Sequence, residues 1–285
     1  MKLVCLGLGY SARALASRLA SRGWDIVGTA RTPEGAAALS AHGWQGIAFS
    51  GERPSSELAA AIRSATHVVV SIPAGAGTDP ALVQHVEDLA AAPRLQWIGY
   101  LSTIGVYGDA AGGWVDETTP PEPTLTRTGH RIAAERAWLD LGRASGKRAI
   151  VFRLAGIYGP GRNAVENLRA GTARRIVKPG YVSNRIHVDD IATTLLAAID
   201  RTPGHDIYNV TDDEPAPPQD VVAYAAELIG MPVPPETPFD PAAMTPMAAS
   251  FYATCKRVRN DRIKTDLGAQ LAYPTYREGL RALAA

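Results

Sequence analysis

Two glycines near the start of the chain have the spacing that is needed to hold a phosphate group. The residues from Gly7 to Ala12 read GLGYSA and follow a short apolar run. In such a GxGxxA pattern the first glycine permits a tight turn, the second lets a phosphate approach the backbone, and the small last residue lets a helix pack on a strand. Free amides at the helix N-terminus then face the anion. The pattern predicts a dinucleotide site formed by Gly7, Gly9, Tyr10, Ser11 and Ala12; the alternative is a turn whose glycines are needed only for steric reasons.

The residues after the second apolar run distinguish between the two nicotinamide cofactors. NAD-binding proteins usually place an acidic side chain there, which accepts hydrogen bonds from the ribose hydroxyls. This chain has Arg31 and Thr32 instead, with no acidic residue before Glu34. Because a guanidinium suits a 2′-phosphate, the sequence predicts that NADP(H) is preferred over NAD(H). The alternative is a solvated arginine at the strand end. Ile72 and Pro73, where the fourth apolar run ends, complete the predicted cofactor contacts.

The elements that would position these residues follow a regular order. Apolar runs of strand length alternate with Ala/Leu-rich stretches of helical spacing, which is the pattern of βα units on a parallel sheet. The predicted strands are residues 2–6, 25–30, 46–49, 67–72, 95–101 and 148–154. The predicted helices between them are residues 11–22, 34–41, 55–63, 79–91 and 127–144. This order predicts an α/β protein with a Rossmann-type doubly wound parallel sheet.

The rhythm changes after residue 153, where a Gly/Pro-rich turn begins. Helices are predicted at residues 163–170 and 189–199, and a strand at residues 207–210 is expected to return to the main sheet. Beyond it, a proline-rich stretch surrounds one more predicted helix, at residues 219–229, whose apolar face indicates a folded lobe with long loops.

The change of rhythm suggests two parts of unequal size. We expect residues 1–159 to form the NADP(H)-binding Rossmann domain, completed by about residues 186–211. Residues 160–185 and 212–285 would then form a smaller C-terminal substrate-binding lobe.

Further segments occur in a recognisable order. Residues 97–109 read WIGYLSTIGVYGD and are followed by ETTP at 117–120, residues 153–161 read RLAGIYGPG, and residues 186–192 read IHVDDIA. In this order they resemble the extended and atypical short-chain dehydrogenase/reductases, the NAD-dependent epimerase/dehydratase-like family. The resemblance spans nearly the whole chain, and it implies a Rossmann fold, a nicotinamide cofactor and a small-molecule substrate.

The resemblance also assigns catalytic positions. Thr103 takes the place of the family's catalytic Ser/Thr, whose hydroxyl can hydrogen-bond a substrate oxygen. The family's Tyr and Lys, four residues apart on the next helix, are replaced by Arg127 and Arg131, so the chain lacks the YxxxK pair. Arg127 cannot act as a tyrosine-like acid or base, because arginine stays protonated. Arg131 is expected to supply the cation that reaches the cofactor ribose or a phosphate; the alternative is a surface arginine paired with Glu135.

Two tyrosines near the predicted site are candidates to replace the missing proton donor. Tyr107 follows Thr103 by four residues, and Tyr158 lies in the RLAGIYGPG segment. The alternative for both is that the ring packs at the boundary of the lobe, which is the more frequent role of such aromatic residues. We include Tyr107 among the predicted catalytic residues, with Thr103 and Arg131.

The region before the IHVDDIA segment bears on the substrate. Epimerases of the family usually carry an arginine four residues before the histidine, which grips the substrate's phosphate; here Ser183 stands in that place. Positive charge nearby comes from Arg174, Arg175, Lys178 and Arg185. His187 is interpreted as a structural hydrogen-bonding residue, and Asp189 or Asp190 as the cap of the following helix.

Composition narrows the remaining classes of function. A formal net charge of +1 lacks the basic excess of a nucleic-acid-binding surface, and the start of the chain is too short an apolar run for a membrane span or signal peptide. The two cysteines show no metal-binding spacing, so no metal site is predicted and a cytoplasmic location is expected. We expect a monomer or homodimer.

Two hypotheses for function remain open. The first is an NADP(H)-dependent oxidoreductase or epimerase/dehydratase-like enzyme that acts on a small carbonyl, hydroxyl or sugar-like substrate. The second is a non-catalytic NADP(H)-binding sensor or regulatory protein, which the loss of the Tyr/Lys pair favours. Retention of Thr103 and of a full C-terminal lobe favours the enzyme.

Overall fold

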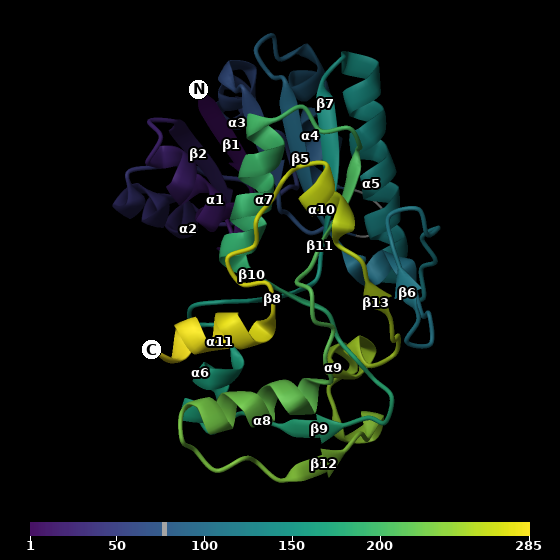
Figure 1. Cartoon of the computed structure of the whole chain (residues 1–285). Helices are drawn as coiled ribbons and strands as arrows, with labels where there is room; N and C mark the ends of the chain where they lie inside the picture. The colour runs from purple at the N-terminus through teal and green to yellow at the C-terminus, as the bar shows by residue number, and fades with distance from the viewer. Residues whose placement is uncertain (76–78) are drawn as a thin grey trace.

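A seven-stranded parallel sheet forms the upper half of the computed structural model, which describes residues 1–75 and 79–285 (Figure 1). Its strand order is β11-β7-β5-β4-β1-β2-β3, and every neighbouring pair is parallel. The strands are β1 (Lys2–Leu6), β2 (Asp25–Ala30), β3 (Gln45–Ala48), β4 (His67–Val70), β5 (Trp97–Thr103), β7 (Arg148–Leu154) and β11 (Ile207–Val210). The chain winds outward in both directions from β1 and β4. This order confirms the predicted doubly wound fold.

Helices cover both faces of the sheet. One face carries α1 (Tyr10–Ala20) and α7 (Val188–Asp200), which bury Leu15 and Leu195 in one hydrophobic cluster. The other carries α3 (Ser56–Ser64), α4 (Pro80–Ala91) and α5 (Thr126–Ser145), which bury Ile62 and Trp138 in a second cluster. A short α2 (Pro33–Ala37) and the 3-10 helix η1 (Ala38–His42) lead into β3. Because both faces are covered, the strands read as continuous apolar runs.

The predicted strand bounds agree closely with these elements. Residues 2–6, 25–30, 148–154 and 207–210 are strands as predicted, and the last one joins the sheet beside β7, which confirms its expected return. The fourth strand ends at Val70, two residues earlier than predicted, since the Ser71 and Ile72 amides turn inward to bond the Leu6 carbonyl. Ile72 and Pro73 therefore lie in the loop beyond the sheet edge.

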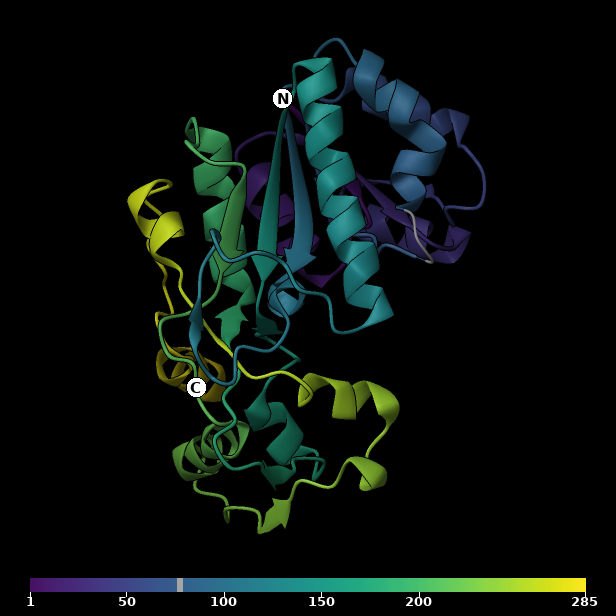
Figure 2. The ribbon, with the colours of Figure 1, turned by 90° about the vertical axis from the view of Figure 1, so that its right-hand side faces the viewer.

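The lower half of the molecule, which contains residues 164–177, 218–251 and 276–284, is mainly helical (Figures 1 and 2). Its core contains Val165 of α6 (Ala164–Arg169), Ala225 of α8 (Pro218–Leu228) and Tyr276 of α11 (Tyr276–Ala284). A parallel pair of short strands, β9 (Arg175–Val177) and β12 (Glu236–Pro238), lies beneath them. The 3-10 helix η3 (Pro241–Ala243) and α9 (Pro246–Phe251) lead back toward the upper half.

Short elements join the two halves. The pairs are β8 (Gly156–Tyr158) with β10 (Arg185–His187), and β6 (Trp114–Val115) with β13 (Arg257–Val258), while the 3-10 helix η2 (Ile104–Tyr107) follows β5. Strands of two or three residues leave little periodicity in a sequence, and these were not predicted.

One stretch of the proposed lobe packs elsewhere. Ile263 of α10 (Asp261–Thr265) and Leu267 lie in the same hydrophobic cluster as Leu3 of the central sheet, rather than in the lower core. The division of the chain into a cofactor domain and a substrate lobe otherwise stays a prediction. None of the helices in the described part of the chain is long and apolar enough to cross a membrane.

Candidate functional site

The GLGYSA turn lies where the strand order reverses, between the carboxyl ends of β2 and β4. Gly7 has φ +87°, a conformation that favours glycine, and an added Cβ would lie 3.0 Å from Cγ1 of Ile72. Its amide donates to Oγ1 of Thr29 on β2 at 2.7 Å. The first glycine is therefore needed both for the turn and for the close packing of β4's loop. In open α/β sheets, ligands bind at this kind of position.

The N-terminus of α1 is open. Gly9 is its N-cap residue, and within the described residues no side chain caps this end; the first turn also contains no acidic residue. A Cβ built on Gly9 would have no atom within 4 Å. The first amides of a helix have no partner inside the helix, so this end presents free N–H groups to open space. A phosphate fits this environment in both charge and room.

The three residues after Gly9 face different ways. Ser11 and Ala12 are buried, so their side chains pack against the sheet and only their amides can face a ligand. Tyr10 is about one-third exposed, and its hydroxyl donates to the Pro160 carbonyl at 3.0 Å. The predicted phosphate loop thus contacts the turn that begins the lower half of the molecule.

Arg31 follows the last residue of β2 directly, as the predicted strand end requires. It is exposed, and no hydrogen bond or ion pair of its guanidinium occurs within residues 1–75 and 79–285. Thr32 is exposed as well, and its hydroxyl accepts from the Gly35 amide at 3.2 Å as the N-cap of α2. The cation next to the sheet edge is therefore available to a ligand.

Thr103 is the last residue of β5 and is half-buried. Its hydroxyl oxygen accepts from the Gly105 amide at 3.1 Å, which starts the short helix η2. A hydroxyl that accepts one hydrogen bond still has its own hydrogen to donate. The geometry is compatible with a hydrogen bond to a substrate oxygen.

Arg131 reaches the carboxyl end of the same strand from α5. Its Nη1 donates to the Tyr100 hydroxyl and to the Leu101 carbonyl, each at 3.1 Å. The alternative pairing with Glu135 is wrong. Glu135 is buried and accepts from Arg153 at 2.7 Å and from Ser102, because these two side chains meet it from β7 and β5 at the sheet side of α5. Arg131 is thus held over the sheet edge by neutral partners.

The hydroxyls of the two candidate tyrosines are both engaged. Tyr107 is buried, donates to the side-chain oxygen of Asn209 at 2.7 Å, and has the Arg153 guanidinium 4.9 Å above its ring. Burial raises its pKa. Tyr158 is buried against α11, where its hydroxyl lies 3.5 Å from the Thr275 carbonyl, and burial raises its pKa as well. This geometry favours packing for both, and catalysis by Tyr107 stays a prediction.

The environment of the IHVDDIA segment corrects one expectation. Neither aspartate caps α7: the N-cap is His187, whose Nδ1 accepts from the Asp189 amide at 3.2 Å. Asp190 is fully buried and accepts from the amides of Ala272 at 2.7 Å and Tyr273 at 3.0 Å. Its side chain faces a segment more than eighty residues away in sequence, which no local pattern could reveal.

The basic residues of the lower half serve different contacts. Arg175 forms an ion pair with Glu236 at 3.1 Å. Arg185 donates to the carbonyls of Ser183 and Ala216, at 3.1 and 3.2 Å. Beside it, burial raises the pKa of Asp212 to about 8, although the Arg185 charge lowers it in part.

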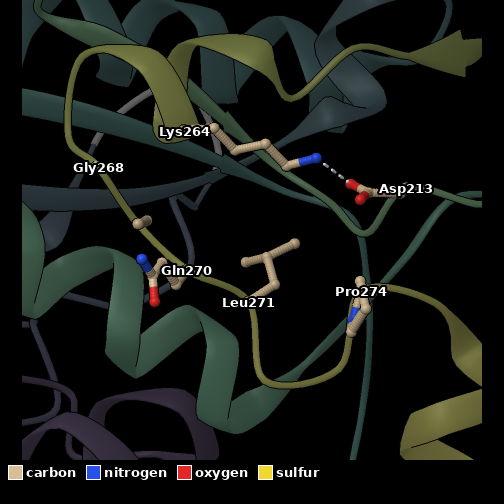
Figure 3. A pocket seen from close by; sticks show the side chains of 7 residues that line it. Asp213, Lys264, Gly268, Gln270, Leu271 and Pro274 are labelled. Carbon is tan, nitrogen blue, oxygen red and sulfur yellow. Dashed lines mark hydrogen bonds and ion pairs between the residues drawn. The ribbon is translucent and has the colours of Figure 1, made fainter.

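A separate shallow hollow of about 390 Å³ lies near α10 (Figure 3). Lys264 and Asp213 form an ion pair of 2.6 Å at its edge, and Leu271 and Pro274 line it. None of its lining residues belongs to the predicted cofactor or catalytic set, so the hollow is a different surface from the candidate site.

Comparison with known proteins agrees with this architecture. The family model described as the NAD dependent epimerase/dehydratase family matches residues 4–211. A structure of a functionally unknown conserved protein from Silicibacter pomeroyi DSS is 49% identical and superposes with a TM-score of 0.88, covering 99% of this chain and 98% of that one.

Two curated relatives are each 31% identical. Protein YeeZ of Escherichia coli strain K12 aligns over 240 residues, which is 81% of this chain and 84% of that protein. The 3-diazoavenalumate denitrifying reductase of a Streptomyces species aligns over 185 residues, 58% of each chain.

Proposed function

This chain belongs to the NAD dependent epimerase/dehydratase family, and from that premise we propose that it is an NADP(H)-dependent oxidoreductase or epimerase/dehydratase-like enzyme acting on a small carbonyl, hydroxyl or sugar-like substrate. The observation that carries the proposal is the open N-terminus of α1 behind Gly7 and Gly9. We further propose that the protein is a cytoplasmic monomer or homodimer.

The residues at the sheet edge fit a bound dinucleotide. The amides of Gly9, Tyr10, Ser11 and Ala12 would hold the pyrophosphate, because they are helix-end donors with no partner among the described residues, beside a position with room for it. Arg31 would bind the 2′-phosphate from the end of β2 and so favour NADP(H). Ile72 and Pro73 would border the cofactor at the loop after β4.

The chemistry that this chain supplies is polarisation and positioning. When bound, a nicotinamide supplies hydride transfer. The Thr103 hydroxyl would donate a hydrogen bond to the substrate oxygen, and Arg131 would hold the ribose by its free guanidinium donors. The reductase among the relatives agrees with this class of reaction.

Calorimetric titration with NADPH, NADP⁺, NADH and NAD⁺ tests the proposal, once copurifying nucleotide has been removed. We expect micromolar binding of the NADP pair and weaker binding of the NAD pair. If none of the four nucleotides binds, both the enzyme hypothesis and the sensor hypothesis are wrong. Tighter binding of NADH than of NADPH would remove the argument from Arg31.

A specific observation supports the second candidate, a non-catalytic NADP(H) sensor. Helix α5 has no tyrosine or lysine, and the hydroxyl of Tyr107, the predicted replacement for the proton donor, donates to Asn209. Loss of NADPH absorbance with a panel of aldehydes and ketones separates the candidates. Turnover that is lost in Thr103→Ala supports the enzyme, whereas tight binding without turnover of any member supports the sensor.

A further inference from the structure

Arg127, which stands where the family keeps its catalytic tyrosine, is held by weak partners. Its Nη2 donates to the Ser250 hydroxyl at 2.8 Å, and its Nη1 lies 2.6 Å from the Met247 sulfur. The Phe251 ring lies 5.5 Å from the guanidinium carbon. A thioether is a poor acceptor, and neither partner carries charge. No carboxylate pairs with this guanidinium in the part of the chain that the structure describes.

A second cation lies one turn further along the same helix face. Arg131 is four residues after Arg127, and its partners are likewise a hydroxyl and a carbonyl. The first turn of α5 has no acidic residue. Two like charges at this spacing repel each other, and Arg127 also lies in the first turn of α5, at the positive end of the helix. A bound anion would offset both the repulsion between the two arginines and the unfavourable effect of the helix end on a cation.

This cationic face is adjacent to the predicted catalytic hydroxyl. A Cβ added to Gly105 would lie 3.4 Å from Oγ1 of Thr103 and 3.6 Å from Cγ2 of Thr128. The first turn of α5 therefore packs against the turn that presents Thr103. A small molecule could contact the Thr103 hydroxyl with its carbonyl oxygen and the Arg127 guanidinium with an anionic end.

Helix α9 belongs to the lower half and lies below the N-terminal end of α5 (Figure 2), where its Met247 and Ser250 contact Arg127. Its C-terminal end is fixed from below, since the Tyr181 hydroxyl donates to the Phe251 carbonyl and Lys178 Nζ to the Tyr252 carbonyl, each at 2.6 Å. On the helix itself, Met247 is 58% exposed and Phe251 is 62% exposed. Among residues 1–75 and 79–285, the side-chain hydrogen bonds between α9 and the upper half are those of Arg127.

We propose that Arg127 recognises a carboxylate on the substrate, and that α9 occupies its guanidinium until the substrate arrives. The planar fork of arginine matches a carboxylate in two parallel hydrogen bonds, which a thioether and one hydroxyl do not equal. This inference rests on the proposed function and adds a substrate class to it: a carbonyl or hydroxyl compound that bears a carboxylate. The position that holds the acid/base tyrosine in the family thus holds, in this chain, an arginine that sets substrate specificity.

Matched probes test this assignment with the NADP⁺-loaded protein. We would measure by calorimetry the affinities of 4-carboxybenzaldehyde and of its neutral methyl ester for the wild type, Arg127→Gln, Arg127→Lys and Arg136→Gln. Arg136 is exposed nine residues along α5 and therefore lies on the opposite face. We expect the acid to bind about 10- to 100-fold more tightly than the ester, the range of charge-assisted pairing. This preference should disappear in Arg127→Gln, weaken in Arg127→Lys and persist in Arg136→Gln.

Hydrogen exchange of the amides of residues 247–252 provides an independent readout. The acid should speed their exchange in the wild type, the ester should not, and Arg127→Gln should exchange fast without any probe. Equal affinity for acid and ester, binding of neither, or the same loss in Arg136→Gln overturns the proposal. NADP⁺ binding, measured first for each variant, shows that the variant is folded. It also separates the two failures: normal cofactor binding without carboxylate preference refutes the role of Arg127 and leaves the proposed function intact.

Discussion

A single guanidinium at the end of β2 decides cofactor preference in our proposal. Arg31 is exposed and unpaired within the described residues, so a 2′-phosphate would pair with its positive charge without displacing another partner. We predict that Arg31→Asp weakens NADPH binding by about 1 to 3 kcal/mol, the scale of a lost charge-assisted hydrogen bond. NADH binding should change less, because NADH lacks that phosphate.

Calorimetry of both nucleotides with both proteins measures this difference. Arg53→Asp makes the same charge change at another exposed position and serves as the control. Equal losses for NADPH and NADH in Arg31→Asp would contradict the assignment.

A second residue-scale prediction concerns pH. Asp212 is 1% exposed, and burial raises its pKa from 3.8 to about 8, against the opposing effect of Arg185. The folded protein therefore holds this proton between about pH 4 and pH 8, whereas the unfolded chain has lost it. Stability from this group is fully present below about pH 4 and is lost as the pH rises through 8.

Urea unfolding between pH 5 and pH 8 checks the sign. The free energy of unfolding of the wild type should fall more steeply with rising pH than that of Asp212→Asn. Asp140→Asn, at an exposed position on α5, should keep the wild-type slope. Parallel curves for wild type and Asp212→Asn would mean that Asp212 titrates in its ordinary range.

At the level of single elements, the open end of α1 leads to a prediction in which the free energy of unfolding and the affinity for NADPH change in opposite directions. Gly9 has extended φ and ψ and free space around its Cα, so an aspartate fits there and can cap the helix. We predict that Gly9→Asp raises the free energy of unfolding by a few tenths to about 1 kcal/mol. It should also weaken NADPH binding at least roughly tenfold, because the carboxylate occupies the anion site and repels phosphate.

Gly9→Asn separates the two effects. It caps the helix without charge, so it should gain similar stability and lose less affinity. Thermal unfolding and calorimetry on both variants measure this. Unchanged NADPH affinity in Gly9→Asp would place the phosphates away from α1.

At the scale of the whole molecule, one buried carboxylate ties the end of the chain to the sheet half. Asp190 of α7 accepts two amides of the segment that leads into α11. Its removal takes away the carboxylate partner of both part-buried amides. We predict that Asp190→Ala lowers the free energy of unfolding by about 1 to 3 kcal/mol, from roughly 0.5 to 1.5 kcal/mol for each of the two lost hydrogen bonds.

Chemical denaturation, with hydrogen exchange of α11, measures this loss and shows where it begins. Asp189→Ala is the matched control, because its half-exposed carboxylate accepts from no backbone amide of residues 272 and 273 and lies 3.7 Å from Arg18 and 3.6 Å from Nδ1 of His187. A loss no larger than that of Asp189→Ala would mean that water replaces the carboxylate at these amides.

The fold of the sheet half of the molecule can be predicted from its sequence. Its strands are buried on both faces, so they appear as apolar runs between helices of regular spacing, and the order of those runs selects a doubly wound sheet. The predictions for the GLGYSA turn and Arg31 rest on the same kind of signal: both adjoin strand ends, and the chemistry predicted for them needs only neighbours close in sequence.

Which polar side chains meet, in contrast, depends on how distant segments of the chain pack together. Glu135 bonds Arg153 and Ser102 rather than Arg131, and Asp190 bonds amides of residues 272 and 273 rather than its own helix. Arg127 reaches α9, 120 positions further along the chain. The physical reason is that a buried charge takes whichever partner the packing brings to it, and packing joins segments whose separation in sequence carries no local signal.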